Sequence, residues 1–118
     1  MNFRFQKKEK LKSRKTIEFL FEKGKSKSVF PLKMFYSPNL NSENTQATFA
    51  VPKRNFKRAV DRNRIKRQLR GSYRLQKHLL NTDDFQPVAI LFLYLGKEEV
   101  PSKVIESAMI SLLKKLNL

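Results

Sequence analysis

The chain has 118 residues, no cysteine, and a formal net charge of +16 from 26 Lys and Arg against 10 Asp and Glu. The absence of cysteine excludes disulfide scaffolds, Cys-ligated zinc sites and thiol catalysis. The charge favours a polyanionic partner, with RNA or DNA ahead of an anionic membrane surface. Because 40% of the residues are hydrophobic and ten are Phe, the sequence predicts a folded domain rather than a disordered basic tail.

No segment of the sequence predicts secretion or membrane insertion. The first residues alternate Phe with Lys and Arg, and they lack the apolar stretch of a signal peptide. The longest apolar run, residues 88–95, is far shorter than the roughly 20 residues of a membrane-spanning helix. We therefore expect a cytoplasmic protein with one RNA-binding domain over residues 13–118. Residues 1–12 predict a basic N-terminal arm that is mobile or ordered by a partner.

The first predicted element is a short helix. It begins at Ser13, and Gly24 ends it. Its apolar positions recur at helical spacing: Ile17, Leu20 and Phe21. Residues 25–28 then predict a turn, because they alternate Lys with Ser.

Residues 29–37 predict a strand with two chemically different faces. Leu32, Met34 and Tyr36 share one face, whereas Phe35 shares the other with Lys33. Polar residues 38–45 then predict a hairpin loop. Residues 46–51 predict the return strand, paired antiparallel with the first, and Pro52 ends it.

The second half of the chain predicts a long basic helix, a buried strand and a final helix. A basic loop over residues 53–58 leads into a helix over residues 58–80, and a turn follows at residues 81–84. Residues 87–95 are unbroken apolar sequence, which indicates a strand buried on both faces. The last helix begins at Ser102, and its apolar stripe is Ile105, Met109, Leu112, Leu113 and Leu116.

The order helix–strand–strand–helix–strand–helix, with room for an extra short strand, indicates the α+β class. We expect a two-layer sandwich in which helices cover a small mixed sheet mainly on one face. The sequence shows no internal repeat and no second domain.

The polar face of the helix over residues 58–80 is almost entirely cationic. Between Lys53 and Lys77 there are eleven basic residues and one acid, Asp61. An ordinary solvated face mixes both signs in i,i+4 pairs, so phosphate binding is favoured over a merely solvated face. Asn63, set among these cations, suits a hydrogen bond to a base edge, a phosphate or a 2′-hydroxyl, although it also fits a simple polar helix position.

Two aromatic residues form a weaker candidate site. Phe35 lies beside Lys33 on its strand face, and aromatic rings fringed by cations suit the stacking of unpaired bases. A Phe is more often a core residue. The pattern leaves both interpretations equally open for Phe35 and favours the core for Phe21.

Catalysis by the polypeptide is poorly supported, and we predict no catalytic or metal-ligating residue. The three Asp and seven Glu are scattered over unrelated segments, whereas a two-metal nuclease needs converging carboxylates. The single histidine, His78, has no obvious carboxylate partner, so a surface histidine is favoured over a general base. If the chain takes part in a reaction, a partner supplies the catalyst.

The segment Arg62-Asn63-Arg64-x-Lys66-Arg67-x-x-Arg70 resembles the signature of the protein subunit of bacterial ribonuclease P. The similarity covers roughly residues 8–116. It also includes these flanking features: Leu11-Lys12, Phe21, Gly24, Val51-x-Lys53-Arg54, Ala59-Val60 and residues 112–116.

Two positions depart from that family's pattern. The family usually has a glycine shortly before the Ala59-Val60 pair, whereas residues 53–58 lack glycine and run one residue longer, which leaves this loop's conformation open. The family also usually has a phenylalanine where Ile17 stands, so part of its aromatic cleft is aliphatic in this chain.

The resemblance implies a fold and a function. In that family the RNA subunit is the ribozyme that hydrolyses the phosphodiester between the 5′ leader and the mature tRNA. The protein is a non-catalytic cofactor with an α+β fold akin to a ribosomal-protein domain and an unusual left-handed crossover at the signature helix. Its expected partners are the catalytic RNA and precursor tRNA, with no membrane and no obligate protein partner. The expected Mg²⁺ ions are held by the RNA.

The family's binding residues carry over to matching positions of this chain. The signature helix, expected to pack on the catalytic RNA, provides Arg62, Asn63, Arg64, Lys66, Arg67 and Arg70. The cleft expected to bind the single-stranded leader is formed by Ile17, Phe21, Phe35, Lys53 and Arg54. One alternative is a structural RNA-binding protein, such as a ribosomal protein, without a role in cleavage. A protein-only nuclease is disfavoured by the scarcity of carboxylates.

Overall fold

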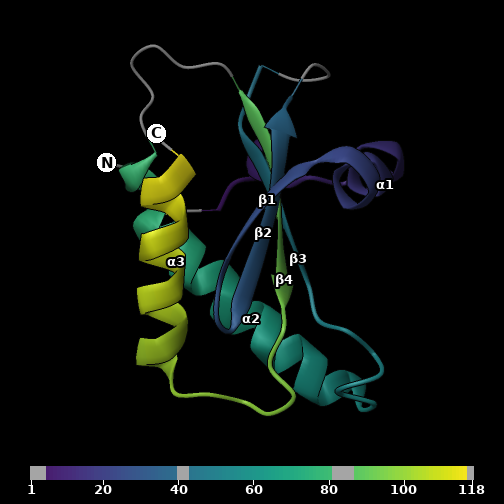
Figure 1. Ribbon diagram of the computed structural model, residues 1–118, viewed down its shortest axis with the longest axis vertical. Coiled ribbons are helices and arrows are strands. Elements are labelled where there is room, and N and C mark those ends of the chain that lie inside the picture. The colour runs from purple at the N-terminus through teal and green to yellow at the C-terminus, as the bar shows by residue number, and fades with distance from the viewer. Residues whose placement is uncertain (1–4, 40–42, 81–86, 117–118) are drawn as a thin grey trace.

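The computed structural model describes residues 5–39, 43–80 and 87–116. Its helices and strands are α1 (Arg14–Lys23), β1 (Lys25–Val29), β2 (Leu32–Pro38), β3 (Gln46–Ala50), α2 (Ala59–Gln76), β4 (Val88–Tyr94) and α3 (Ser102–Leu116). The strands of this part form one mixed sheet in the order β1-β2-β4-β3. Figure 1 shows α2 and α3 on one face of the sheet and α1 on the other. The predicted α+β sandwich, covered mainly on one face, is confirmed.

The larger core lies between the sheet and the pair α2 and α3. Leu32 and Met34 of β2 are fully buried in it, as their alternation predicts. Ile65 and Leu69 provide the buried side of α2. The predicted stripe of α3 is confirmed, with four buried residues and one partly buried at the end of the helix: Ile105, Met109, Leu112, Leu113 and Leu116.

A second, smaller core lies between the sheet and α1. β4 serves both cores, because Ile90 and Phe92 face α2 and α3 while Ala89 and Leu91 face α1. This arrangement confirms that the apolar strand is buried on both faces. The smaller core consists of Leu11, Leu20, Phe35, Ala89 and Leu91, with Ile17 and Leu93 packed against it.

Two predictions about the sheet are wrong. Residues 25–28, expected in a turn, belong to the edge strand β1, which pairs antiparallel with β2. Polar and charged side chains suit an exposed sheet edge, so β1 gives no apolar signal in the sequence. The expected antiparallel pair of β2 and β3 is absent as well, because β4 lies between them and pairs parallel with β3.

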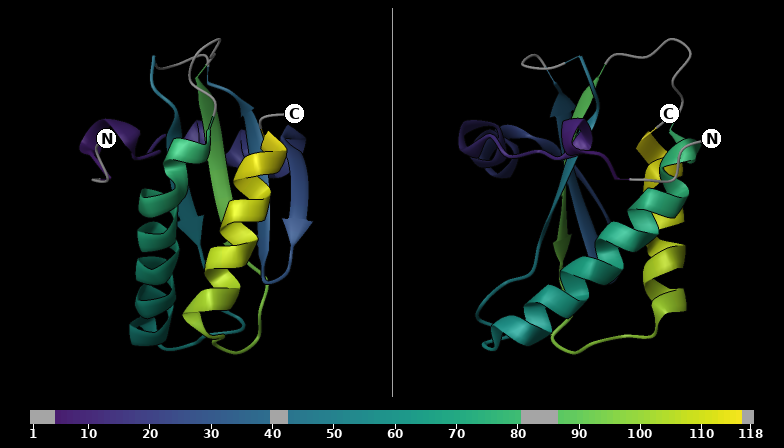
Figure 2. Two further views of the ribbon diagram at one scale, coloured as in Figure 1. Left: turned by 90° about the vertical axis from the view of Figure 1, so that its left-hand side faces the viewer. Right: turned by 180° about the vertical axis from the view of Figure 1, so that it is seen from behind.

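The parallel neighbours β3 and β4 are joined by a crossover through α2. In the left view of Figure 2, both strands run downward, α2 lies in front of the sheet, and the chain passes from left to right. A right-handed connection passes from right to left in such a view, so this crossover is left-handed, against the usual preference. The crossover expected at the signature helix is therefore present.

The residues before α1 pack on the fold. They follow β3, with a bridge between Lys10 and Ala47. The ring of Phe5 meets Tyr73 edge-on at a centroid distance of 5.7 Å. The sequence assigns residues 1–12 to an arm, whereas the described part of that arm adds to the larger core.

Both ends of the helix α1 lie where the sequence predicts them. Ser13 caps its first turn, because the Ser13 Oγ accepts a hydrogen bond from the Thr16 backbone N–H at 3.3 Å. At the other end, a Cβ placed on Gly24 would lie 2.6 Å from the Leu20 carbonyl oxygen. Glycine is therefore required at the point where the chain leaves α1 for β1.

Candidate nucleic-acid interface

The helix α2 turns a cationic ridge away from the core. Its buried side consists of Ile65, Leu69 and Tyr73. On the opposite side, four polar residues recur at helical spacing, and we call them the outer ridge: Asn63, Arg67, Arg70 and Arg74. Because the buried side anchors α2 on the sheet, these side chains extend from a rigid support.

Arg67 and Arg70 carry charge that the described part of the protein does not neutralise. Both are exposed, and neither forms an ion pair or a side-chain hydrogen bond with a described residue. Lys66, half-buried beside them, is likewise without such a partner among these residues. Like charges at this spacing weaken an isolated helix, so an external polyanion is the partner that relieves the repulsion.

Arg62 has an intramolecular role. Its Nη1 donates hydrogen bonds to the carbonyl oxygens of Phe56 and Lys57, both at 2.8 Å. Phe56 is buried, and its ring meets that of Tyr94 edge-on at 5.8 Å. Arg62 and Phe56 thus fix the loop over residues 53–58, whose conformation the sequence leaves open. No described residue has a positive φ, so this loop does not need the family's usual glycine.

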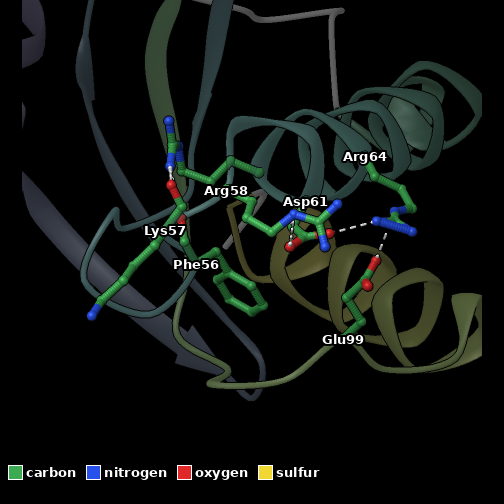
Figure 3. Close-up of polar contacts among 7 residues, drawn as sticks. Phe56, Lys57, Arg58, Asp61, Arg64 and Glu99 are labelled. Atoms are coloured by element: carbon green, nitrogen blue, oxygen red, sulfur yellow. Dashed lines mark hydrogen bonds and ion pairs between the residues drawn. The ribbon is translucent and has the colours of Figure 1, made fainter.

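Arg64 ties the start of α2 to the segment before α3, as Figure 3 shows. Its Nη2 lies 2.6 Å from Asp61 Oδ1, and its Nε lies 3.3 Å from Glu99 Oε1. The hydrogen bond that Arg64 donates to Asp61 is the main cause that raises the pKa of Arg64 above its usual value, and the charge of Glu99 adds to it. The sequence assigns Arg62 and Arg64 to the RNA-binding signature, and it reveals neither the loop carbonyls nor Glu99.

The second candidate surface lies on the opposite face of the sheet, beside α1. The rings of Phe21 and Phe35 lie 5.2 Å apart at an angle of 58°, and the Lys33 Nζ lies 5.0 Å from the centroid of Phe35. We call these three residues the aromatic site. Phe35 is only 9% exposed, whereas Phe21 is 47% exposed.

These exposures correct the prediction that Phe21 is a core residue. In Figure 1, α1 lies on the right-hand face of the sheet and no other described helix or strand lies on its outer side, so one flank of this helix is left uncovered. Helical periodicity places Phe21 with Leu20 and Ile17, yet only Leu20 is fully buried. Phe35 provides the buried support, and Phe21 offers the accessible ring.

The structure divides the predicted leader cleft into two parts. Ile17 packs against the small core that contains Phe35, close to the aromatic site. Lys53 and Arg54 are exposed in the loop that follows β3, and no described contact joins them to Phe21 or Phe35. In Figure 1, α1 and this loop lie toward opposite ends of β3.

A strip of sheet leads from the aromatic site toward that basic loop. Lys33 is paired with Leu93, and Leu93 is paired with Ala50, the last residue of β3. These three side chains share the face of Phe35, because residues two apart on a strand point the same way. All three are partly exposed, so an extended chain can lie along this strip.

The described residues offer neither a metal site nor a transmembrane helix. Within residues 5–39, 43–80 and 87–116, no three His, Cys, Asp or Glu side chains are grouped so that they could hold a metal ion. No helix in this part of the chain is long and apolar enough to cross a membrane. His78 is exposed after α2 and lies outside the two surfaces.

Comparison with known proteins places the chain among ribonuclease P proteins. A family model described as Ribonuclease P matches residues 5–117. The chain is 39% identical over 114 residues to the "Ribonuclease P protein component" of Porphyromonas gingivalis, covering 91% of this chain and 82% of the relative. It is 37% identical over 111 residues to that of Chlorobium phaeobacteroides, covering 82% and 76%.

Solved structures support the same fold. The ribonuclease P protein of Thermotoga maritima superposes with a TM-score of 0.75 at 21% identity, covering 91% of this chain and 96% of the other. That of Staphylococcus aureus superposes with a TM-score of 0.72 at 17% identity, covering 92% and 94%. At these identities the structural likeness supports the fold alone.

Proposed function

Since the chain belongs to the ribonuclease P protein family and is a protein component of that enzyme, we propose that it is the non-catalytic RNA-binding subunit. The RNA subunit hydrolyses the phosphodiester between the 5′ leader and the tRNA in the cytoplasm, as an endoribonuclease whose Mg²⁺ ions are held by RNA. The observation that carries this proposal is the outer ridge, whose Arg67 and Arg70 have no acidic partner among the described residues.

The outer ridge binds the catalytic RNA in this proposal. A folded RNA presents phosphates along its surface, and each phosphate neutralised by Arg or Lys releases condensed counterions. Arg67 and Arg70 extend from a helix that the larger core already holds in place. RNA binding therefore does not have to order this helix first. Asn63 and Lys66 lie on the same part of α2 and add a polar and a cationic contact.

Arg62 and Arg64 support this surface from within. Arg62 holds the loop that displays Lys53, Arg54 and Lys57, so these cations face the RNA in a fixed arrangement. Arg64 retains its charge while Asp61 and Glu99 orient it, and it offers its remaining donors to a phosphate.

The aromatic site binds the 5′ leader. A single-stranded leader has unpaired bases, and stacking on an aromatic ring is worth about 1–3 kcal/mol per base. Phe21 offers an exposed ring, and Lys33 places a cation next to the ring beneath it. The partly exposed strip from Lys33 to Ala50 then directs the strand toward Lys53 and Arg54. Because mature tRNA lacks the leader, this contact favours substrate over product.

The test is cleavage of a leader-bearing precursor tRNA by reconstituted mixtures. We expect no cleavage by the protein alone, and we expect efficient cleavage at moderate Mg²⁺ once a bacterial ribonuclease P RNA is added. Cleavage by protein freed of all RNA contradicts the proposal, since it makes the polypeptide the nuclease. A protein that binds RNA without any gain in cleavage would support the alternative of a structural RNA-binding protein.

A further inference from the structure

Gly71 occupies the interior of α2 although the fold does not require a glycine there. A Cβ on Gly24 would lie 2.6 Å from a backbone oxygen, and one on Gly96 would lie 2.8 Å from the Tyr94 ring. A Cβ on Gly71 would meet no atom within 4 Å. Glycine weakens a helix interior relative to alanine. Gly71 therefore leaves a gap on the surface of α2, although a glycine there lowers the stability of the helix.

The gap lies on a groove between α2 and α3. Leu75, which is 46% exposed, forms part of its wall. The Gln68 Oε1 and the Ser72 Oγ are buried beside the groove and have no hydrogen-bond partner in the described part of the chain. A buried polar atom without a partner is unfavourable, so these two atoms indicate a missing partner. The groove is lined by Gln68, Gly71, Ser72, Leu75, Gln76, Ser102, Ile105 and Glu106.

The chemistry of this groove differs from that of the outer ridge beside it. Gly71 is three and four residues from Arg74 and Arg67, so it borders the ridge on the helix surface. The arginines of the ridge provide only cationic donors, whereas the groove contains an amide oxygen, hydroxyls and the Glu106 carboxylate. A phosphate has no proton to give such acceptors. A hydroxyl group does.

The RNA backbone offers both a hydroxyl donor and a phosphate acceptor, because each ribose 2′-hydroxyl lies next to a phosphate. We propose that the groove between α2 and α3 binds the 2′-hydroxyl edge of a strand of the catalytic RNA. Gly71 lets the ribose approach the helix, Leu75 contacts its carbon face, and Arg67 holds the adjoining phosphate. The inference rests on the proposed function and names the part of the RNA that this side of α2 recognises.

The substitution Gly71→Leu tests the proposal, because it fills the groove on a helix that tolerates the new side chain. We expect affinity for the ribonuclease P RNA of Porphyromonas gingivalis to fall roughly tenfold, while the melting temperature stays equal or rises. The dependence of affinity on salt should keep its slope, since no phosphate contact is removed. Gly71→Ala should raise the melting temperature and lower affinity about threefold. Ser107→Leu adds the same bulk at an exposed position of α3 outside the groove, and it should leave affinity unchanged.

A second measurement detects the contact with the 2′-hydroxyl directly. In an RNA pool carrying scattered 2′-deoxy substitutions, we expect a few positions to weaken binding of the wild-type protein and to have no effect on binding of Gly71→Leu. Wild-type affinity in Gly71→Leu overturns the inference, and so does an interference pattern that is the same in both proteins. If Gly71→Leu does not fold, an unchanged affinity of Gly71→Ala overturns it instead. Failure of the wild-type protein to bind the RNA contradicts the proposed function itself, so the two failures are distinguishable.

Discussion

The outer ridge of α2 and the aromatic site beside α1 lie on opposite faces of one sheet, and they are built differently. On the ridge, Arg67 and Arg70 stand exposed and without a described partner on a helix anchored by its other side. At the aromatic site, the buried ring of Phe35 supports the exposed ring of Phe21. Charge needs only a rigid support, whereas a stacking platform needs a neighbouring ring held in place.

The difference determines which RNA each surface suits. Attraction by the ridge depends on phosphates, so it acts on paired and unpaired RNA alike and weakens as salt rises. Stacking depends on the faces of unpaired bases rather than on phosphate charge. The ridge therefore fits a large folded RNA, and the aromatic site fits a short single-stranded extension.

Truncating Phe35 should change the protein most, through the stability of the aromatic site. Phe35→Ala removes a buried ring between the sheet and α1, and we expect the free energy of unfolding to fall by about 3 kcal/mol. Urea unfolding followed by circular dichroism measures this loss. A loss below about 1 kcal/mol would mean that Phe35 does not hold Phe21 in place.

Removing both exposed arginines of the ridge should have the next largest effect. The double substitution Arg67→Ala with Arg70→Ala should weaken binding to ribonuclease P RNA by about 2 kcal/mol at low salt. The slope of log affinity against log salt should fall by roughly 1.5, because two phosphate contacts are lost.

A filter-binding titration at several salt concentrations gives both quantities. The matched control is Lys97→Ala with Lys114→Ala, which removes two exposed charges elsewhere and should change the slope little. An unchanged slope in the arginine variant would refute the assignment of the ridge.

Phe21→Ala should act on substrate binding rather than on stability. Its ring is 47% exposed, so we expect an unfolding free energy within about 1 kcal/mol of the wild type. Binding of precursor tRNA by the reconstituted enzyme should weaken by about 1.5 kcal/mol, and binding of mature tRNA should stay the same. Equal losses on both ligands would exclude a stacking role. Phe19→Ala on the same helix is the control, because it removes an equally exposed ring outside the aromatic site.

Arg62→Ala should separate positioning of the loop from direct contact with RNA. The loss of two hydrogen bonds to loop carbonyls should lower the unfolding free energy by about 1 kcal/mol. RNA affinity should fall at all salt concentrations with nearly the same salt slope, since the cation is already engaged within the protein. If Arg62→Ala lowers the salt slope by as much as the loss of one ridge arginine does, Arg62 binds a phosphate directly.

Local sequence patterns predict the elements that bury an apolar stripe. Ile65 and Leu69 mark α2, the stripe from Ile105 marks α3, and the apolar run of β4 marks a strand buried on both faces. Each signal lies within one segment, where helical or strand periodicity alone determines the spacing.

The remaining features depend on contacts between distant segments. The strand β1 carries Lys and Ser on an exposed edge, so its pairing with β2 leaves no pattern that distinguishes it from a turn. The position of β4 between β2 and β3 is a property of the whole sheet. Likewise, the exposure of Phe21 depends on where α1 crosses the sheet, and the partners of Arg62 lie in a loop that periodicity does not describe.

If the two surfaces bind different RNAs independently, as we propose, a double-mutant cycle should show no coupling between them. Precursor tRNA binding and protein–RNA assembly are measured for the wild type, Arg67→Ala with Arg70→Ala, Phe21→Ala, and the triple variant. We predict that assembly responds only to the arginines, that leader binding responds to Phe21, and that the coupling energy stays within about 0.5 kcal/mol. A coupling above about 1 kcal/mol, or a loss of assembly in Phe21→Ala, would show that the two surfaces do not bind independently.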